Sequence, residues 1–272
     1  MPRWVWILSV ALFALPALAQ GSFPVVPSPS DTATAPAQLL RATPPPPDAS
    51  AKELETRGDE LRAEKSYADA IDYYRAALAK TTTKNAVLHN KSGIAQLMML
   101  HYDQAKKEFK RAIKSDPTYA EAHNNLGVVY YSQQDYKNAI RNYEKALALR
   151  EDSASFHSNL GTAYFARKNY DRASAEYLRA LELDPDIFER ESRAGVSARL
   201  PTPGERARFS YVIAKMYAKS GNSDRCLLYL KRALEAGYAG ITDVYKDEEF
   251  TQVRKDPRFT ELMASKPVAV SN

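Results

Sequence analysis

Four glycines recur at a nearly constant interval, and this repeat constrains the possible folds more than any other feature of the chain. Successive glycines lie 34 or 35 residues apart, and each is followed nine residues later by a tyrosine and twelve residues later by an alanine. The glycines are Gly58, Gly93, Gly127 and Gly161, the tyrosines Tyr67, Tyr102, Tyr136 and Tyr170, and the alanines Ala70, Ala105, Ala139 and Ala173. A period of this length is typical of repeat architectures, so the chain is predicted to be a repeat array.

Each unit has the apolar pattern of two amphipathic helices. In the third unit, apolar residues recur three or four positions apart on both sides of a polar break at 133–135. The first stripe holds Ala122, Leu126, Val129 and Tyr130, and the second Ala139, Ile140, Tyr143, Ala146, Leu147 and Leu149. Small residues at the glycine and alanine positions would let the two helices of a pair approach closely.

This combination resembles the tetratricopeptide repeat (TPR) family, whose 34-residue unit asks for glycine, tyrosine, alanine, an aromatic residue, alanine and proline in order. The fourth unit matches it with Leu160, Gly161, Tyr164, Ala173, Tyr177, Ala180 and Pro185. The third matches with Leu126, Gly127, Tyr130, Ala139, Tyr143 and Ala146. The resemblance implies an all-α fold, a right-handed superhelical solenoid of helix-turn-helix repeats.

The repeat pattern divides the chain into segments. Four units are expected within 51–185, and they are bounded at 51–85, 86–119, 120–153 and 154–187. A segment at 188–206 with several arginines and two prolines interrupts the array, as a loop or short helix. A degenerate fifth unit follows at 207–240, with Ala214 in the glycine place and Cys226 in the first alanine place. Residues 241–272 are expected to cap the apolar end of the array.

The first 50 residues have a different composition. Residues 1–19 combine Arg3, an apolar run and the motif Ala-Leu-Ala, which predicts a secretory signal cleaved after Ala19. The alternative is an uncleaved signal that anchors the chain in a membrane, and this is the only membrane association expected. Residues 20–50 carry eight prolines and almost no charge, a composition that predicts a disordered tether. The protein is therefore expected to be exported, to the periplasm.

The sequence offers no recognisable catalytic, cofactor or metal motif. His89, His123 and His157 occupy the same place in three successive units. Equivalent helices of neighbouring units would lie about 8–10 Å apart, too far for the imidazoles to share one metal ion easily, so we expect these histidines to serve packing. The net charge of +5 is spread along the helices, which does not indicate a nucleic-acid site. We expect a protein that is not an enzyme and needs no cofactor.

The resemblance places the first helix of each unit on the concave side of the solenoid. The expected groove combines amides, which can bond to the main chain of a peptide, with apolar contact area. An equally open alternative is that asparagine is generic to the repeat at these positions and that the groove is merely polar. The predicted groove residues are Asn90, Lys91, Ile94 and Met98, then Asn124, Asn125, Val128 and Tyr131, and then Ser158, Asn159, Thr162 and Phe165.

These observations predict a monomeric scaffold that binds a protein or an extended peptide, within an assembly of the bacterial cell envelope. Glu55 and Asp59 stand where chaperone-binding members of the family use cations to clamp a terminal carboxylate, which argues against that ligand. An alternative is an assembly factor for a secretion or pilus machine. An alternative of another class is a non-catalytic substrate arm of an envelope-processing enzyme complex.

Overall fold

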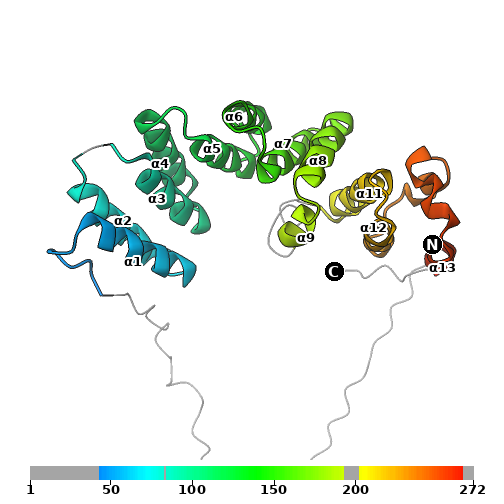
Figure 1. Ribbon diagram of the computed structural model, residues 1–272, viewed down its shortest axis with the longest axis horizontal. Helices are drawn as coiled ribbons and strands as arrows, with labels where there is room; N and C mark the ends of the chain where they lie inside the picture. The colour runs from blue at the N-terminus through cyan, green and yellow to red at the C-terminus, as the bar shows by residue number, and fades with distance from the viewer. Residues whose placement is uncertain (1–42, 83, 193–201, 266–272) are drawn as a thin grey trace, which may run out of the picture. The chain divides into compact units, whose positions relative to one another are not determined.

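A computed structural model of the chain describes residues 43–82, 84–192 and 202–265, which all belong to one compact unit, Ala42–Asn272. The predicted signal and most of the predicted tether lie outside these residues. Within them all regular structure is helical, in agreement with the predicted all-α class (Figure 1). None of the described helices is both long enough and apolar enough to cross a membrane.

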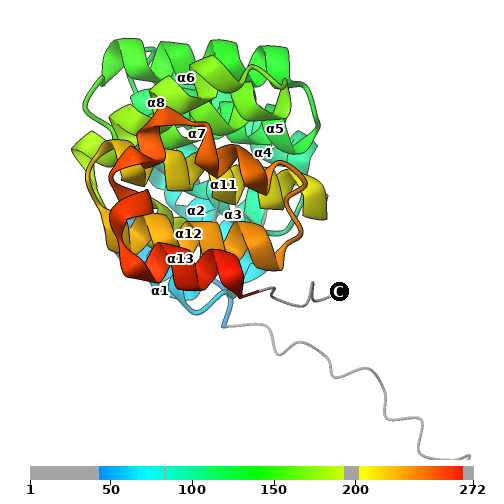
Figure 2. The same ribbon diagram turned by 90° about the vertical axis from the view of Figure 1, so that its right-hand side faces the viewer.

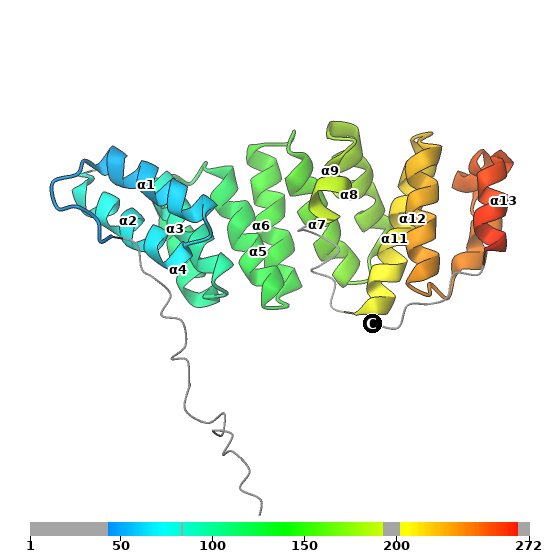
Figure 3. The same cartoon turned by 90° about the horizontal axis from the view of Figure 1, so that it is seen from below.

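The helices follow one another as pairs. The two helices of each pair contact each other, and the second helix of each of the first three pairs contacts the first helix of the next (Figure 3). The first helices α3, α5 and α7 also contact one another in succession. The pairs are α1 (Ala51–Ala63) with α2 (Tyr67–Lys80), α3 (Ala86–Met98) with α4 (Tyr102–Ser115), α5 (Ala120–Ser132) with α6 (Tyr136–Leu149), α7 (Ala154–Ala166) with α8 (Tyr170–Leu183), and α11 (Pro203–Lys219) with α12 (Ser223–Glu235).

The repeated glycines lie under aromatic rings. A Cβ atom added to Gly127 would lie 2.6 Å from Cε1 of Tyr143, the residue sixteen positions later on the second helix. The same contact joins Gly58 to Tyr74, Gly93 to Phe109 and Gly161 to Tyr177. The sequence predicted close helix packing at these glycines, and the structure identifies the group that approaches as a ring.

In the fifth pair of helices, two other residues stand in place of the glycine and the ring. Ala214 stands in the glycine place, and the residue sixteen positions later is Leu230, which is fully buried. Cys226, in the alanine place, is also fully buried, and burial raises the pKa of its thiol to about 12. The extra methyl of Ala214 is therefore accompanied by an aliphatic side chain where the other units carry a ring.

One residue in the turn of every pair has a left-handed backbone. It lies seven positions after the glycine place, and in the first four pairs it is Lys65, Leu100, Gln134 and Lys168, with φ between 61° and 63°. The fifth pair has Gly221 there, with φ 77°. Non-glycine residues adopt this conformation at a cost of about 1–2 kcal/mol. The fifth pair thus has no glycine in the glycine place, but the glycine in the turn between its helices avoids the cost of the left-handed backbone.

A short helix, α9 (Ile187–Ser192), lies between the fourth and fifth pairs, at the start of the predicted insertion. Phe188 on α9 is 1% exposed, and its ring meets the rings of Tyr177 and Phe209 edge to face at centroid distances of 5.4 and 6.1 Å. Phe188 therefore joins α8 to α11. Residues 193–201 of the predicted insertion lie outside the described residues.

The ends of the described region are covered by irregular segments. Three short 3₁₀ helices, η1 (Ile241–Tyr245), η2 (Glu248–Thr251) and η3 (Val253–Lys255), precede α13 (Pro257–Ala264). Here η2 contacts α11, and α13 packs on α12 (Figure 2). At the other end, Tyr73 donates a hydrogen bond to the carbonyl of Thr43, and Lys80 donates one to the carbonyl of Pro47. Residues 43–50, which the sequence assigns to the tether, thus lie against α2.

The buried side chains form one large cluster and several smaller ones. The large cluster runs from Tyr131 on α5 to Phe259 on α13 and includes most of the buried rings. The first two units share a separate cluster that runs from Leu54 to Ala95. The apolar core is therefore continuous in the C-terminal part of the array and divided in the N-terminal part.

Candidate functional site

The predicted groove residues lie on α3, α5 and α7, and the contacts between these helices bring them into one row. They differ in accessibility. Met98 is 54% exposed, and Lys91, Ile94, Asn125 and Val128 are partly exposed. The buried members are Asn90, Asn124, Tyr131, Ser158, Asn159, Thr162 and Phe165. The accessible part of the row therefore belongs to the second and third units.

The asparagines of this row are bonded to one another across three units. Asn125 donates to Oδ1 of Asn90 at 2.9 Å, and Asn159 donates to Oδ1 of Asn124 at 3.0 Å. Asn124 donates to Oδ1 of Asn125 at 3.2 Å, which joins the two contacts. Each buried amide thus satisfies part of its hydrogen-bonding capacity within the protein. A peptide would meet amide edges already engaged on one side.

Lys91 connects the second unit to the first. Its ammonium lies 2.6 Å from Oε1 of Glu55 and 2.6 Å from Oδ2 of Asp59. Burial disfavours the charged ammonium, but these two carboxylates outweigh it and raise the pKa of Lys91. The hydroxyl of Tyr74 donates to the other oxygen of Asp59 at 2.8 Å. The two acids on α1 are therefore paired with one cation of this chain.

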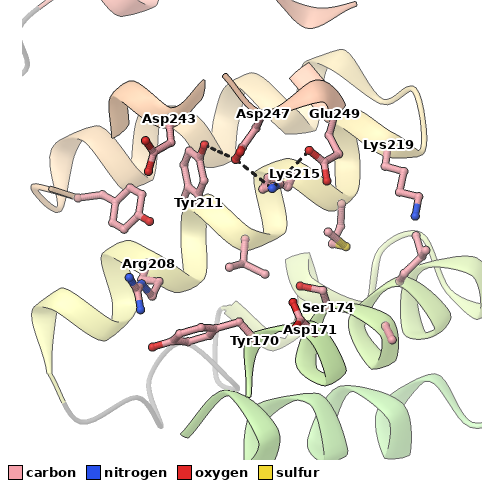
Figure 4. A pocket seen from close by; sticks show the side chains of 15 residues that line it. Tyr170, Asp171, Ser174, Arg208, Tyr211, Lys215, Lys219, Asp243, Asp247 and Glu249 are labelled. Atoms are coloured by element: carbon pink, nitrogen blue, oxygen red, sulfur yellow. Dashed lines mark hydrogen bonds and ion pairs between the residues drawn. The ribbon is translucent and has the colours of Figure 1, made fainter. Parts of the chain in front are cut away.

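A pocket of about 550 Å³ opens beside the fifth unit (Figure 4). Its walls come from residues 170–178 of α8, one face of α11, and residues 238–249, which include η1. Tyr170 lies on one side and Tyr211 on the other, and the ring of Tyr238 lies against Tyr211 with the centroids 4.7 Å apart. The remaining lining residues are Asp171, Ser174, Ala175, Leu178, Arg208, Val212, Lys215, Met216, Lys219, Asp243, Asp247 and Glu249.

A chain of polar contacts forms one wall of this pocket. The ammonium of Lys215 lies 2.9 Å from Oδ2 of Asp247 and 3.3 Å from Oε2 of Glu249, and Tyr211 donates to the same Oδ2 at 2.8 Å (Figure 4). Burial opposes ionisation of Asp247, yet Lys215 and Tyr211 hold the pKa of that carboxyl below its usual value. Burial lowers the pKa of Lys215 less than its two carboxylates raise it. Lys215, Asp247 and Glu249 therefore form an ion-paired triad in this wall.

The offsets of the predicted groove residues can be extended to the fifth unit, where they fall on residues of the pocket. Asn124 stands three positions before Gly127, Asn125 stands two positions before it, and Val128 stands one position after it. At the same offsets from Ala214 stand Tyr211, Val212 and Lys215, which all line the pocket. The sequence places Ala214 in the glycine place of the predicted fifth unit, but the predicted groove residues end with the fourth unit. The offsets from Ala214 were the signal that could have found them.

The three periodic histidines do not share a ligand. His89 and His157 each bond through Nδ1 to a glutamate on the second helix of their own pair, at 2.7 Å to Glu108 and 2.6 Å to Glu176. His123 bonds through Nε2 to the carbonyl of Pro117 at 3.0 Å. Among residues 43–82, 84–192 and 202–265, no three histidine, cysteine or acidic side chains are placed to hold a metal ion.

Comparisons with known proteins agree with the repeat assignment. A family model described as "TPR repeat" matches residues 101–134 and 129–167, and one described as "Tetratricopeptide repeat" matches residues 154–187. The matched residues and the stacked helix pairs together support the TPR repeat family. Among curated proteins none matches this chain.

Solved structures with a similar arrangement of helices include three proteins at low identity. MamA is 23% identical, with 66% of this chain and 93% of that chain covered and a TM-score of 0.47. A thermophilic TPR protein of Thermus thermophilus is 18% identical, with 79% and 100% covered and a TM-score of 0.49. YrrB, described as a TPR protein with an unusual peptide-binding site, is 18% identical, with 72% and 91% covered and a TM-score of 0.47. Because each TM-score is below 0.5, none of these structures informs the function of this chain.

Proposed function

We propose that this protein is an exported, non-enzymatic scaffold that binds a protein or an extended peptide along the first helices of its repeats, within a bacterial cell-envelope assembly. The observation that carries the proposal is the row of side chains across α3, α5 and α7, whose sequence offsets in the fifth unit are held by residues that line the pocket beside α11. A row that crosses several units suits a long ligand, because stacked repeats offer an extended surface. Export rests on the signal-like sequence of residues 1–19.

The accessible members of the row show where a ligand would make contact. Met98 is 54% exposed, and Val128 one unit later is partly exposed. Exposed apolar side chains flanked by polar groups are common at contact surfaces, and methionine adapts its shape to different partners. Met98 is therefore the best position at which to place a chemical probe.

Site-specific photo-crosslinking tests the binding surface. The photoreactive amino acid benzoylphenylalanine replaces Met98 in one protein and Leu149 in another, both expressed in the native host. Leu149 is a matched control, since it ends α6, a second helix, and is 43% exposed. A defined adduct from position 98 and none from position 149 is expected. An adduct from position 149 alone, or from neither position, would refute binding along the first helices.

The mass of the mature protein tests export separately. Cleavage after Ala19 would leave Gln20 as the first residue. Protein purified from the periplasmic fraction should then have an N-terminal peptide that begins at Gln20. Intact Met1 in a cytoplasmic fraction would contradict export, and intact Met1 in the membrane fraction would instead support the anchored alternative.

A further inference from the structure

The pocket beside α11 has the chemistry of a site for a positively charged side chain. Seven charged side chains line it, the cations Arg208, Lys215 and Lys219 and the acids Asp171, Asp243, Asp247 and Glu249. The sum is −1 when all are ionised. Two of the three cations are engaged with other groups of the wall, and the third lies at its edge.

Lys215 and Arg208 are the engaged cations. The Lys215 ammonium lies between Asp247 and Glu249, and one positive charge there faces two negative ones. The Arg208 guanidinium lies over the ring of Tyr170, 4.5 Å from its centroid. Lys219, the third cation, is exposed and lies at one side of the opening (Figure 4). Acid oxygens therefore exceed ammonium groups along the wall of the triad.

Three aromatic rings supply another part of the inner surface. The rings of Tyr211 and Tyr238 lie against each other with their centroids 4.7 Å apart, and the ring of Tyr170, which lies under Arg208, also lines the pocket. Figure 4 shows Tyr211 and Tyr170 on α11 and α8. Ring faces attract cations, and carboxylates accept charge-assisted hydrogen bonds from ammonium and guanidinium groups. A volume of about 550 Å³ lies within the range of small-ligand sites, so it also has room for a long side chain and its flanking main chain.

We propose that this pocket binds a lysine or arginine side chain of the polypeptide that lies along the first helices. The proposal rests on the proposed function and specifies its ligand, since Tyr211, Val212 and Lys215 occupy the groove offsets of the fifth unit. Glu249 is its principal acceptor, with Asp171 on the opposite wall. The pocket thus sets the position along the ligand at which a basic residue stands.

Short capped peptides test the pocket apart from the rest of the groove. The probes are acetyl-Ala-Arg-Ala-amide and its citrulline and glutamate counterparts, titrated into the ¹⁵N-labelled mature chain. Citrulline matches arginine in shape but carries no charge. We expect the arginine peptide to shift the backbone amide signals of Tyr211, Lys215 and Tyr238, and the other two peptides to bind at least about fivefold more weakly. Equal binding of all three, or no shift with arginine at about 10 mM, would overturn the proposal.

Two variants with opposite expected effects separate a role in binding from a role in folding. Glu249→Gln should weaken arginine-peptide binding about five- to tenfold, because it removes the acceptor charge. Lys215→Met should strengthen it, because Asp247 and Glu249 then face the ligand without a competing cation. A variant that only damages the fold would weaken binding in both cases. Glu182→Gln, on α8 outside the pocket, is the matched control. Crosslinking at position 98 remains informative if the pocket fails this test.

Discussion

The contact between Gly127 and Tyr143 leads to a test of how the first and second helices are matched. A Cβ atom at position 127 would lie 2.6 Å from Cε1, 2.7 Å from Cδ1 and 3.1 Å from Cζ of the ring. Tyr143 is 2% exposed, so the ring has little room to move. Overpacking of this kind costs about 1–3 kcal/mol, whereas alanine gains about 1 kcal/mol over glycine in a helix. Gly127→Ala should therefore destabilise the protein by about 1 kcal/mol.

The same substitution should have the opposite sign when the ring is removed. Tyr143→Leu together with Gly127→Ala creates the arrangement that Ala214 and Leu230 have in the fifth pair. In that background the methyl group no longer meets a ring, and only the helix preference of about 1 kcal/mol remains. The two substitutions should thus be coupled by about 2 kcal/mol.

Urea unfolding followed by circular dichroism measures all four members of this cycle. Because repeat arrays can unfold in more than one step, the comparison requires that the four proteins show the same slope with denaturant. An equal effect of Gly127→Ala in both backgrounds would refute the reasoning, since it would mean that the ring is not the group that requires glycine.

Two further predictions concern other contacts of the array. Glu108→Gln should cost about 1 kcal/mol at neutral pH: burial opposes the charged carboxylate, but His89 and Arg111 outweigh it and hold the pKa of Glu108 below 4.5. Because its pKa is lowered on folding, the ionised Glu108 stabilises the fold above pH 4.5, and this contribution is lost as the pH falls through the folded pKa. The difference in unfolding free energy between Glu108→Gln and the unaltered protein, measured by urea unfolding, should therefore shrink in acid. It would not shrink if the pair were neutral. Phe188→Ala should destabilise the protein by about 3–5 kcal/mol in thermal unfolding, and Phe188→Leu by less than half as much. Equal losses of stability in the two variants would mean that the ring does not join α8 to α11.

Periodic features were the part of the fold that the sequence could predict. The spacing of the glycines and of the alanines twelve residues later follows from the geometry of one unit, so it is visible without any tertiary information. Phe188 could not be assigned to the core in this way, because it lies in a segment that no other unit repeats. Its burial depends on Tyr177 and Phe209, two residues from different pairs.

In the candidate site, too, the sequence could predict only the periodic features. The row on α3, α5 and α7 was predicted from the offsets of Asn125 and its equivalents, whereas the hydrogen bonds between the amides were not. Such bonds depend on rotamers and on the distance between neighbouring units, which the sequence does not give. The pocket also needs residues as far apart as Tyr170 and Glu249, and the latter belongs to the irregular segment after the repeats. No periodicity connects those two positions.

The division of the apolar core gives the molecule two ends of different mechanical character. The cluster from Leu54 to Ala95 belongs to the first two units, whereas the larger cluster runs from Tyr131 to Phe259. Tension applied to the N-terminal end of the array would therefore be resisted by few rings and by the ion pairs of Lys91, and α1 and α2 should yield first. The units nearer the C-terminus, which carry the pocket, would remain folded under the same load. A ligand seated there would be insulated from strain that enters through the other end.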